Sequence, residues 1–192
     1  MIAATKTLLS DLMFPEGPRW HDGRLWFTDQ HARKIIAVDL DGKAEVIAGI
    51  DDLPGGLGWL PDGSLLVVSM KKRQILRLHE GEIDIYADLS KKAPFHCNDM
   101  LVDEYGRVYV GNFGYDLHGK EVMKETNLIL IDIHRNLHVV AENLVFPNGM
   151  AINRLKKKLF VAETFANRLT AFEIDQDGLL HNRCTFAQLG EG

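Results

Sequence analysis

The segment FPNGMAINRLKKKLFVAE, residues 146–163, contains the pattern from which the fold can be predicted. It opens on Pro-Asn-Gly, continues as an apolar stretch, turns at a run of lysines and ends in a second apolar stretch. Taken alone, Pro147-Asn148-Gly149 is a turn signal, because asparagine and glycine both tolerate positive φ. The alternative is that Asn148 holds a ligand, and the rest of the sequence bears on that choice.

Three earlier segments repeat the same order of features. They are FPEGPRWHDGRLWFTD (14–29), LPGGLGWLPDGSLLVVS (53–69) and FHCNDMLVDEYGRVYVGN (95–112). One position is equivalent in all four units, and it is occupied by Glu16, Gly55, Asn98 and Asn148, at separations of 39, 43 and 50 residues. A polar loop over residues 115–125 accounts for the longest separation. Self-similarity at such a period is typical of a repeat architecture.

Two further apolar segments follow each pair, which makes four strands in every unit. The third segments are KIIAVDL, QILRLHE, NLILIDI and RLTAFEI, and the fourth are AEVIAGI, IDIYADL, LHVVAEN and CTFAQLG. Alternating apolar residues, β-branched side chains and Gly/Asp/Asn turns favour strands. Four-stranded units of about 40–50 residues predict an all-β fold, a β-propeller with about four blades, in one domain over residues 1–192. A β-sandwich with coincidental spacing is the alternative.

The two ends of the chain add an expectation about ring closure. TKTLLSDL, residues 5–12, precedes the first unit and predicts an additional outer strand of the kind that completes a last blade. The key residue of a fifth unit would fall at or beyond position 187, so we expect the chain to end before that blade begins. Trp20 and Trp59 occupy matching repeat positions and predict core packing between blades.

Composition limits the partners and the compartment. The chain has 46% hydrophobic and 26% charged residues and a net charge of −5, which argues against nucleic acid or an anionic membrane as partner. No apolar run approaches the ~18 residues of a membrane span, and no signal peptide is evident. Cys97 and Cys184 are the only cysteines and form no Cys-x-x-Cys motif, which favours reduced thiols in the cytoplasm.

The equivalent position points to a common centre. The same place in every blade of a propeller lies at the same height around the axis, so we expect Glu16, Asn98 and Asn148 to face one channel mouth. Carboxylate and amide oxygens are hard ligands that suit Ca²⁺, Mg²⁺, Mn²⁺ or a catalytic Zn²⁺. Gly55 has no side chain, which leaves room for a substrate or water. Asn148 is therefore predicted to be more than a turn residue.

Three motifs together resemble the SMP-30/gluconolactonase/LRE-like family, also called the regucalcin family. They are Pro-Glu-Gly-Pro-x-Trp at 15–20, Asn98-Asp99, and Pro-Asn-Gly at 147–149. The resemblance extends over essentially the whole chain. It implies a six-bladed propeller with a divalent cation in its channel, so that about two C-terminal blades would be absent from these 192 residues.

The resemblance also implies roles for individual residues. Glu16 and Asn148 resemble the carboxylate and asparagine metal ligands of the family, and Asn98 resembles the asparagine that contacts substrate or a metal-bound water. His96 stands where some members have an arginine that touches substrate, which puts a sugar-acid specificity in doubt. The family's general base is an aspartate of the next repeat, so no catalytic residue is identified in this chain.

Two acidic residues receive supporting roles. Asp99 is expected to orient its neighbours, and Glu163 ends a strand near the axis, where it could support the ligands.

The function implied by the resemblance is a metal-dependent hydrolase that opens a sugar lactone or a related lactone or ester. A non-catalytic metal-binding or scaffold propeller is one alternative, because a fold alone does not define function. An inactive, truncated remnant is another. Its open blade edges would promote oligomerisation.

Overall fold

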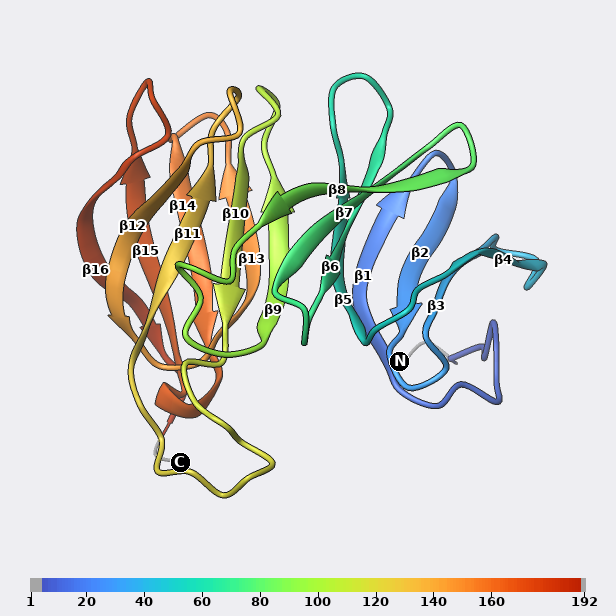
Figure 1. The fold of residues 1–192 in the computed structure, drawn as a ribbon, viewed down its shortest axis with the longest axis horizontal. Coiled ribbons are helices and arrows are strands. Elements are labelled where there is room, and N and C mark those ends of the chain that lie inside the picture. The colour runs from blue at the N-terminus through green and yellow to red at the C-terminus, as the bar shows by residue number, and fades with distance from the viewer. Residues whose placement is uncertain (1–4, 191–192) are drawn as a thin grey trace.

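The computed structural model describes residues 5–190 and confirms the β-propeller architecture, with four antiparallel four-stranded sheets as blades. In Figure 1 the first blade (blue) lies at one side of the molecule with the second (teal) next to it, and the third (green to gold) and fourth (orange to red) overlap on the other side. The first two blades contain β1 (Pro15–His21), β2 (Arg24–Asp29), β3 (Lys34–Val38), β4 (Ala44–Gly49), β5 (Pro54–Trp59), β6 (Leu65–Ser69), β7 (Gln74–His79) and β8 (Glu82–Asp88). The last two contain β9 (Cys97–Val102), β10 (Val108–Asn112), β11 (Thr126–Ile131), β12 (Leu137–Leu144), β13 (Pro147–Asn153), β14 (Lys158–Glu163), β15 (Arg168–Ile174) and β16 (Leu180–Gln188).

One backbone hydrogen bond recurs in all four blades and confirms the repeat alignment. The residue that follows the second strand donates its amide to the carbonyl two positions before the key residue. The four bonds are Gln30 N to Phe14 O (2.9 Å), Met70 N to Leu53 O (3.0 Å), Phe113 N to His96 O (2.9 Å) and Thr164 N to Phe146 O (3.2 Å). Glu16, Gly55, Asn98 and Asn148 are therefore structurally equivalent.

Each inner strand carries a β-bulge that contains the key residue in the second, third and fourth blades and directly follows it in the first, where Glu16 is still paired with Thr28. Between two paired positions the inner strand has one residue more than its neighbour: three steps against two. The four register shifts fall between Glu16 and Arg19, Pro54 and Leu57, Cys97 and Met100, and Pro147 and Met150. A bulge redirects a side chain out of the ordinary strand alternation, and bulges concentrate near functional sites.

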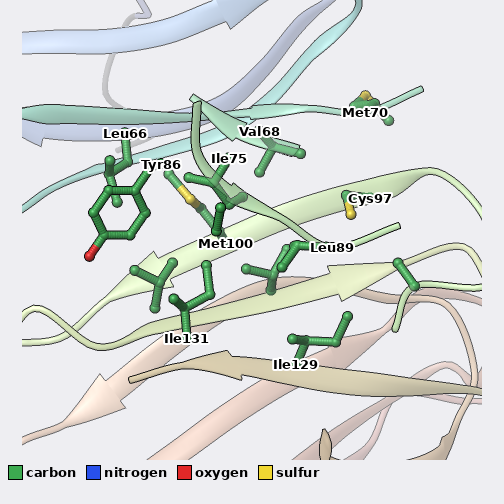
Figure 2. Packing of buried hydrophobic residues seen from close by; sticks show 14 of the residues in the cluster. Leu66, Val68, Met70, Ile75, Tyr86, Leu89, Cys97, Met100, Ile129 and Ile131 are labelled. Carbon is green, nitrogen blue, oxygen red and sulfur yellow. The ribbon is translucent and has the colours of Figure 1, made fainter. Parts of the chain in front are cut away.

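Apolar side chains between neighbouring sheets form the core. The interface of the second and third blades is the largest cluster and includes Leu66, Met100 and Ile129, all fully buried (Figure 2). Smaller clusters join the first blade to the second around Leu57 and the third to the fourth around Tyr109. Burial of both faces of the central sheets explains their nearly continuous apolar runs.

A carboxylate at the end of the second strand accepts hydrogen bonds from backbone amides of the segment that enters the blade, and we call this arrangement the latch. In the first blade, Asp29 accepts hydrogen bonds from the amides of Met13 (3.0 Å) and Phe14 (2.8 Å). In the fourth, the equivalent Glu163 accepts one from the amide of Val145 (2.7 Å). Glu163 is therefore an internal structural group.

The fourth-blade latch also joins β14 to β15. The Glu163 carboxylate accepts two bonds from Arg168, both at 2.8 Å, and a further bond from Thr170. Burial raises the pKa of Glu163, but the hydrogen bonds from Arg168 and Thr170 outweigh burial and hold this pKa below its ordinary value. The expectation that Glu163 supports the ligands stays a prediction, and the hydrogen bonds of Glu163 show that it also has a structural role.

Two sequence-based expectations about the first blade were wrong. Residues 5–12 form no strand, and Leu9 and Leu12 instead pack beside Phe27 and Val38 on the open face of the first sheet. Trp20 is 58% exposed, whereas Trp59 stacks on His21 with ring centroids 3.8 Å apart. The difference arises because no other described blade packs against that side of the first sheet. Among residues 5–190, no helix is long and apolar enough to span a bilayer.

Replacement of Glu163 by glutamine should destabilise the protein by ~3–5 kcal/mol, the usual cost of breaking a buried ion pair. The neutral amide leaves Arg168 uncompensated and loses one acceptor of the latch. Urea unfolding would measure the change. Glu173→Gln is the matched control, since the Glu173 side chain is 50% exposed and lies 3.9 Å from Lys158. A loss no larger than that of the control would contradict the structural role.

Candidate functional site

The candidate site lies at the start of the four inner strands, which follow one another in the order β1, β5, β9, β13. Glycines allow these strands to approach closely. A Cβ on Gly17 would lie 2.9 Å from the Cα of Gly56, and one on Gly55 would lie 2.3 Å from the carbonyl oxygen of Asn98. The key residues therefore form one continuous row.

Asn98 and Asn148 lie on neighbouring strands of this row. The side-chain amide nitrogen of Asn98 donates to the carbonyl oxygen of Pro147 at 3.2 Å. The amide nitrogen of Asn148 donates to the hydroxyl of Thr164 at 3.3 Å. Both hydrogen bonds use nitrogen, so the Oδ1 atoms are the ends left for another partner. Both asparagines are half-buried, and the Asn98 contact reaches the residue directly before Asn148.

Glu16 stands at the other end of the row, with β5 and β9 between it and Asn148. Its carboxyl is half-buried and accepts a hydrogen bond from the amide of Gly17. Burial raises the pKa of Glu16 above its ordinary value, and the negative charge of Asp99 raises it further. A carboxylate held in this way gains from a nearby cation, which would compensate its charge.

His96 belongs to a series of aromatic contacts beside the two asparagines. Its ring stacks on Phe95 at 4.1 Å and lies 6.0 Å from Phe113, with distances between ring centroids. The series continues from Phe113 to Phe146 at 4.4 Å and from Phe146 to Phe165 at 4.7 Å. Burial lowers the pKa of His96, and the positive charge of Lys71 lowers it further. A neutral imidazole near pH 7 can both donate and accept a hydrogen bond.

The donor set suits a hard divalent cation more than a soft one. Glu16, Asn98 and Asn148 offer only oxygen, and Ca²⁺ and Mg²⁺ take carboxylate and amide oxygens with water. Within residues 5–190, no three His, Cys, Asp or Glu side chains gather in a metal-binding cluster. The single carboxylate of the row agrees with that finding. The roles of Glu16, Asn98, Asn148 and His96 remain predictions.

The sequence reasoning missed two features of the site. Arg19 pairs with Asp99 at 2.7 Å and thereby connects the first and third blades. The rings also follow a rule that was readable in the sequence, because an aromatic or imidazole ring stands two positions before the key residue in three units, as Phe14, His96 and Phe146. Two of these rings, His96 and Phe146, contact Phe113 and Phe165, which come after the second strand of their blades. Those contacts could be found only from the fold.

Comparisons with known proteins agree with this architecture. Residues 14–192 match the family described as the SMP-30/Gluconolactonase/LRE-like region. A pentonolactonase of Haloferax volcanii is 24% identical over 178 residues, which cover 92% of this chain and 58% of that protein. The chain thus spans less than two thirds of the length of this curated relative.

Two solved structures share the fold. A gluconolactonase of Xanthomonas campestris superposes with a TM-score of 0.82 at 23% identity, covering 97% of this chain and 66% of that one. A calcium-binding regucalcin of Agrobacterium tumefaciens gives a TM-score of 0.79 at 17% identity, covering 96% and 63%. At these identities the likeness concerns the fold.

Replacement of Glu16 by glutamine should stabilise the metal-free protein at neutral pH. A raised folded-state pKa means that ionised Glu16 costs stability once the pH exceeds that pKa, whereas below the unfolded value of 4.5 there is no such cost. The gain should therefore be present at pH 7 and absent at pH 4. Thermal unfolding with a chelator would measure it, with Glu104→Gln, at an exposed site on the β9–β10 hairpin, as control. A lower melting temperature for Glu16→Gln at pH 7 would contradict the assignment.

The imidazole of His96 should titrate below its ordinary value of 6.5. Because the folded pKa is depressed, this residue contributes stability above pH 6.5, and that stability is lost as the pH falls through the folded pKa. An NMR titration of the histidine resonances, with His96→Gln used for assignment, would measure the pKa. A value above 6.5 would show that Asp52 and Asp116, which act in the opposite direction, dominate its environment.

Proposed function

The chain belongs to the SMP-30/gluconolactonase/LRE-like family, and on that premise we propose that it is a metal-dependent hydrolase that opens the ring of a sugar lactone or a related lactone or ester. The related proteins named above include a pentonolactonase and a gluconolactonase. The activity, the substrate and the metal are all parts of this proposal.

The observation that carries the proposal is the row of oxygen-bearing side chains at the bulges of the inner strands. Glu16, Asn98 and Asn148 occupy equivalent positions in the first, third and fourth blades, and Gly55 leaves the same position open in the second. Aromatic rings border the row at Asn98 and Asn148. Small-molecule sites are commonly apolar hollows with a few convergent polar groups.

Glu16 and Asn148 would hold the cation, with Asn98 beside it. When bound, a divalent cation supplies Lewis acidity, which stabilises negative charge on the lactone carbonyl oxygen. Asn98 and neutral His96 would orient the lactone through hydrogen bonds, and the rings of Phe113, Phe146 and His96 would exclude water from its apolar edge. Hydrolysis adds water to the carbonyl carbon and breaks the ring ester bond, giving the hydroxy acid. The proposal assigns no general base to this chain.

A calcium-binding propeller without turnover is the second candidate. The described oxygens are those that Ca²⁺ prefers, and one structural relative is named as a calcium-binding protein. Cation binding without lactone hydrolysis would separate this candidate from the first.

The remaining parts of the proposal concern partners and location. The partner would be a small lactone, with self-association through the open edge of the fourth blade, where Phe186 is 62% exposed beside Phe160. A cytoplasmic location agrees with free Cys97 and free Cys184.

Lactone hydrolysis that depends on a divalent cation is the expected outcome of an assay with glucono- and pentono-lactones. A chelator should abolish activity, and one of Ca²⁺, Zn²⁺, Mg²⁺ or Mn²⁺ should restore it. Asn148→Ala should lower kcat/KM by ~10- to 100-fold if it removes a ligand contact. Asn153→Ala is the matched control, because Asn153 ends the same strand and only caps the turn at Lys156.

Three outcomes would decide between the candidates. Activity that survives chelation would refute the metal-dependent mechanism. Cation binding with no turnover of any lactone would favour the second candidate. The absence of both would leave the propeller as a scaffold or an inactive remnant.

A further inference from the structure

An ion pair crosses the glycine-rich strand β5 directly beneath the candidate site. Arg19 on β1 donates from Nη2 to Oδ1 of Asp99 on β9 at 2.7 Å. The same nitrogen donates to the carbonyl oxygen of Met100 at 2.8 Å. The two strands lie on either side of β5, so one guanidinium joins the first blade to the third.

The glycines of β5 make this crossing possible. A Cβ on Gly56 would lie 1.8 Å from Oδ1 of Asp99 and 2.6 Å from the amide nitrogen of Met100. No other residue could occupy position 56 without displacing that carboxylate. The Asp99 side chain is 9% exposed and that of Arg19 is 24% exposed, so the pair is largely shielded from water.

The pair also joins two of the bulges. Arg19 is the residue at which β1 returns to register, opposite Trp26, three positions after Glu16. Asp99 lies inside the bulge of β9, between Cys97 and Met100, and directly follows Asn98. Each end of the ion pair thus lies at a bulge that contains or directly follows a candidate ligand, Glu16 in β1 and Asn98 in β9.

The second hydrogen bond of the Asp99 carboxylate strengthens this connection. Its Oδ1 atom accepts from the amide of Met100 at 2.8 Å, within the same bulge. A charged, multiply bonded carboxylate is more restrained than a neutral side chain of the same shape. Asp99 therefore links the bulge on β9 internally, through the Met100 amide, and to β1, through Arg19.

We propose that Arg19 is a positioning residue of the site, whose pairing with Asp99 across Gly56 holds the bulges of β1 and β9 and thereby directs Glu16 and Asn98 toward a common ligand. The inference rests on the proposed function for its ligand, a divalent cation. The restraint of the two bulges is independent of the proposed function and can be measured without any ligand.

The test compares two buried arginine–aspartate pairs. Arg19→Met removes the crossing pair. Arg107→Met is the matched control, because Arg107 and Asp103 are 2.6 Å apart with side chains 8% and 6% exposed, at the β9–β10 hairpin at the far end of the blade. Hydrogen exchange would follow the backbone at residues 15–20 and 97–101. Calorimetric titrations with Ca²⁺, Zn²⁺, Mg²⁺ and Mn²⁺ would follow cation binding.

Arg19→Met should accelerate exchange in both bulges and weaken cation binding by ~10- to 100-fold, as is usual when a residue that orients a metal ligand is lost. Arg107→Met should do neither, although it too loses stability. Arg19→Lys keeps the charge but offers a compact ammonium in place of the planar fork, so it should recover only part of the affinity.

A double variant separates positioning from stability. Arg19→Met with Asp99→Asn removes the uncompensated buried charge, so its stability should return toward that of the wild type. Its cation affinity should stay low, because the bulges remain untied. A purely structural pair would recover both properties together.

Unchanged exchange at both bulges in Arg19→Met would overturn the inference, as would equal effects of Arg107→Met. If the wild type binds none of the four cations, the proposed function fails, and the exchange data alone then decide the role of Arg19.

Discussion

In every blade the inner strand holds one residue more than its neighbour at the place where it enters the sheet, and the candidate site depends on this bulge. A regular strand would alternate its side chains between the two faces of the sheet, where they pack against neighbouring blades. The extra residue interrupts that alternation at Gly55, Asn98 and Asn148 and directly after Glu16. The same local irregularity therefore marks the start of the inner strand in all four blades, which is where the candidate site lies.

The candidate site also depends on the close approach of the inner strands. Gly17 and Gly56 bring β1 against β5, and Gly56 leaves the space into which the Asp99 carboxylate fits. With bulky residues at these points the strands would separate, and Arg19 could not reach across. The glycines of β5 are thus part of the site although they carry no functional group.

The two glutamates have different environments, and these separate a structural carboxylate, Glu163, from Glu16, which we propose as a cation ligand. Glu163 is fully buried and receives hydrogen bonds from Val145, Arg168 and Thr170, which hold its pKa low. Glu16 is half-buried, receives one from Gly17, and burial raises its pKa. The first is satisfied by the protein, whereas the second is held in a state that a bound cation would relieve.

The sequence by itself determined the blade count, the strand order and the equivalence of the key positions, because period-two apolar patterns and turn residues are local properties that repeat with the unit. It also indicated the oxygen-bearing residues of the site. It could not show that Glu163 is a latch, that Trp20 is exposed or that residues 5–12 form no strand, since each depends on which surface lies opposite. Only the tertiary structure decided the Arg19–Asp99 crossing, because residues 80 positions apart meet solely where a glycine of a third strand leaves them room.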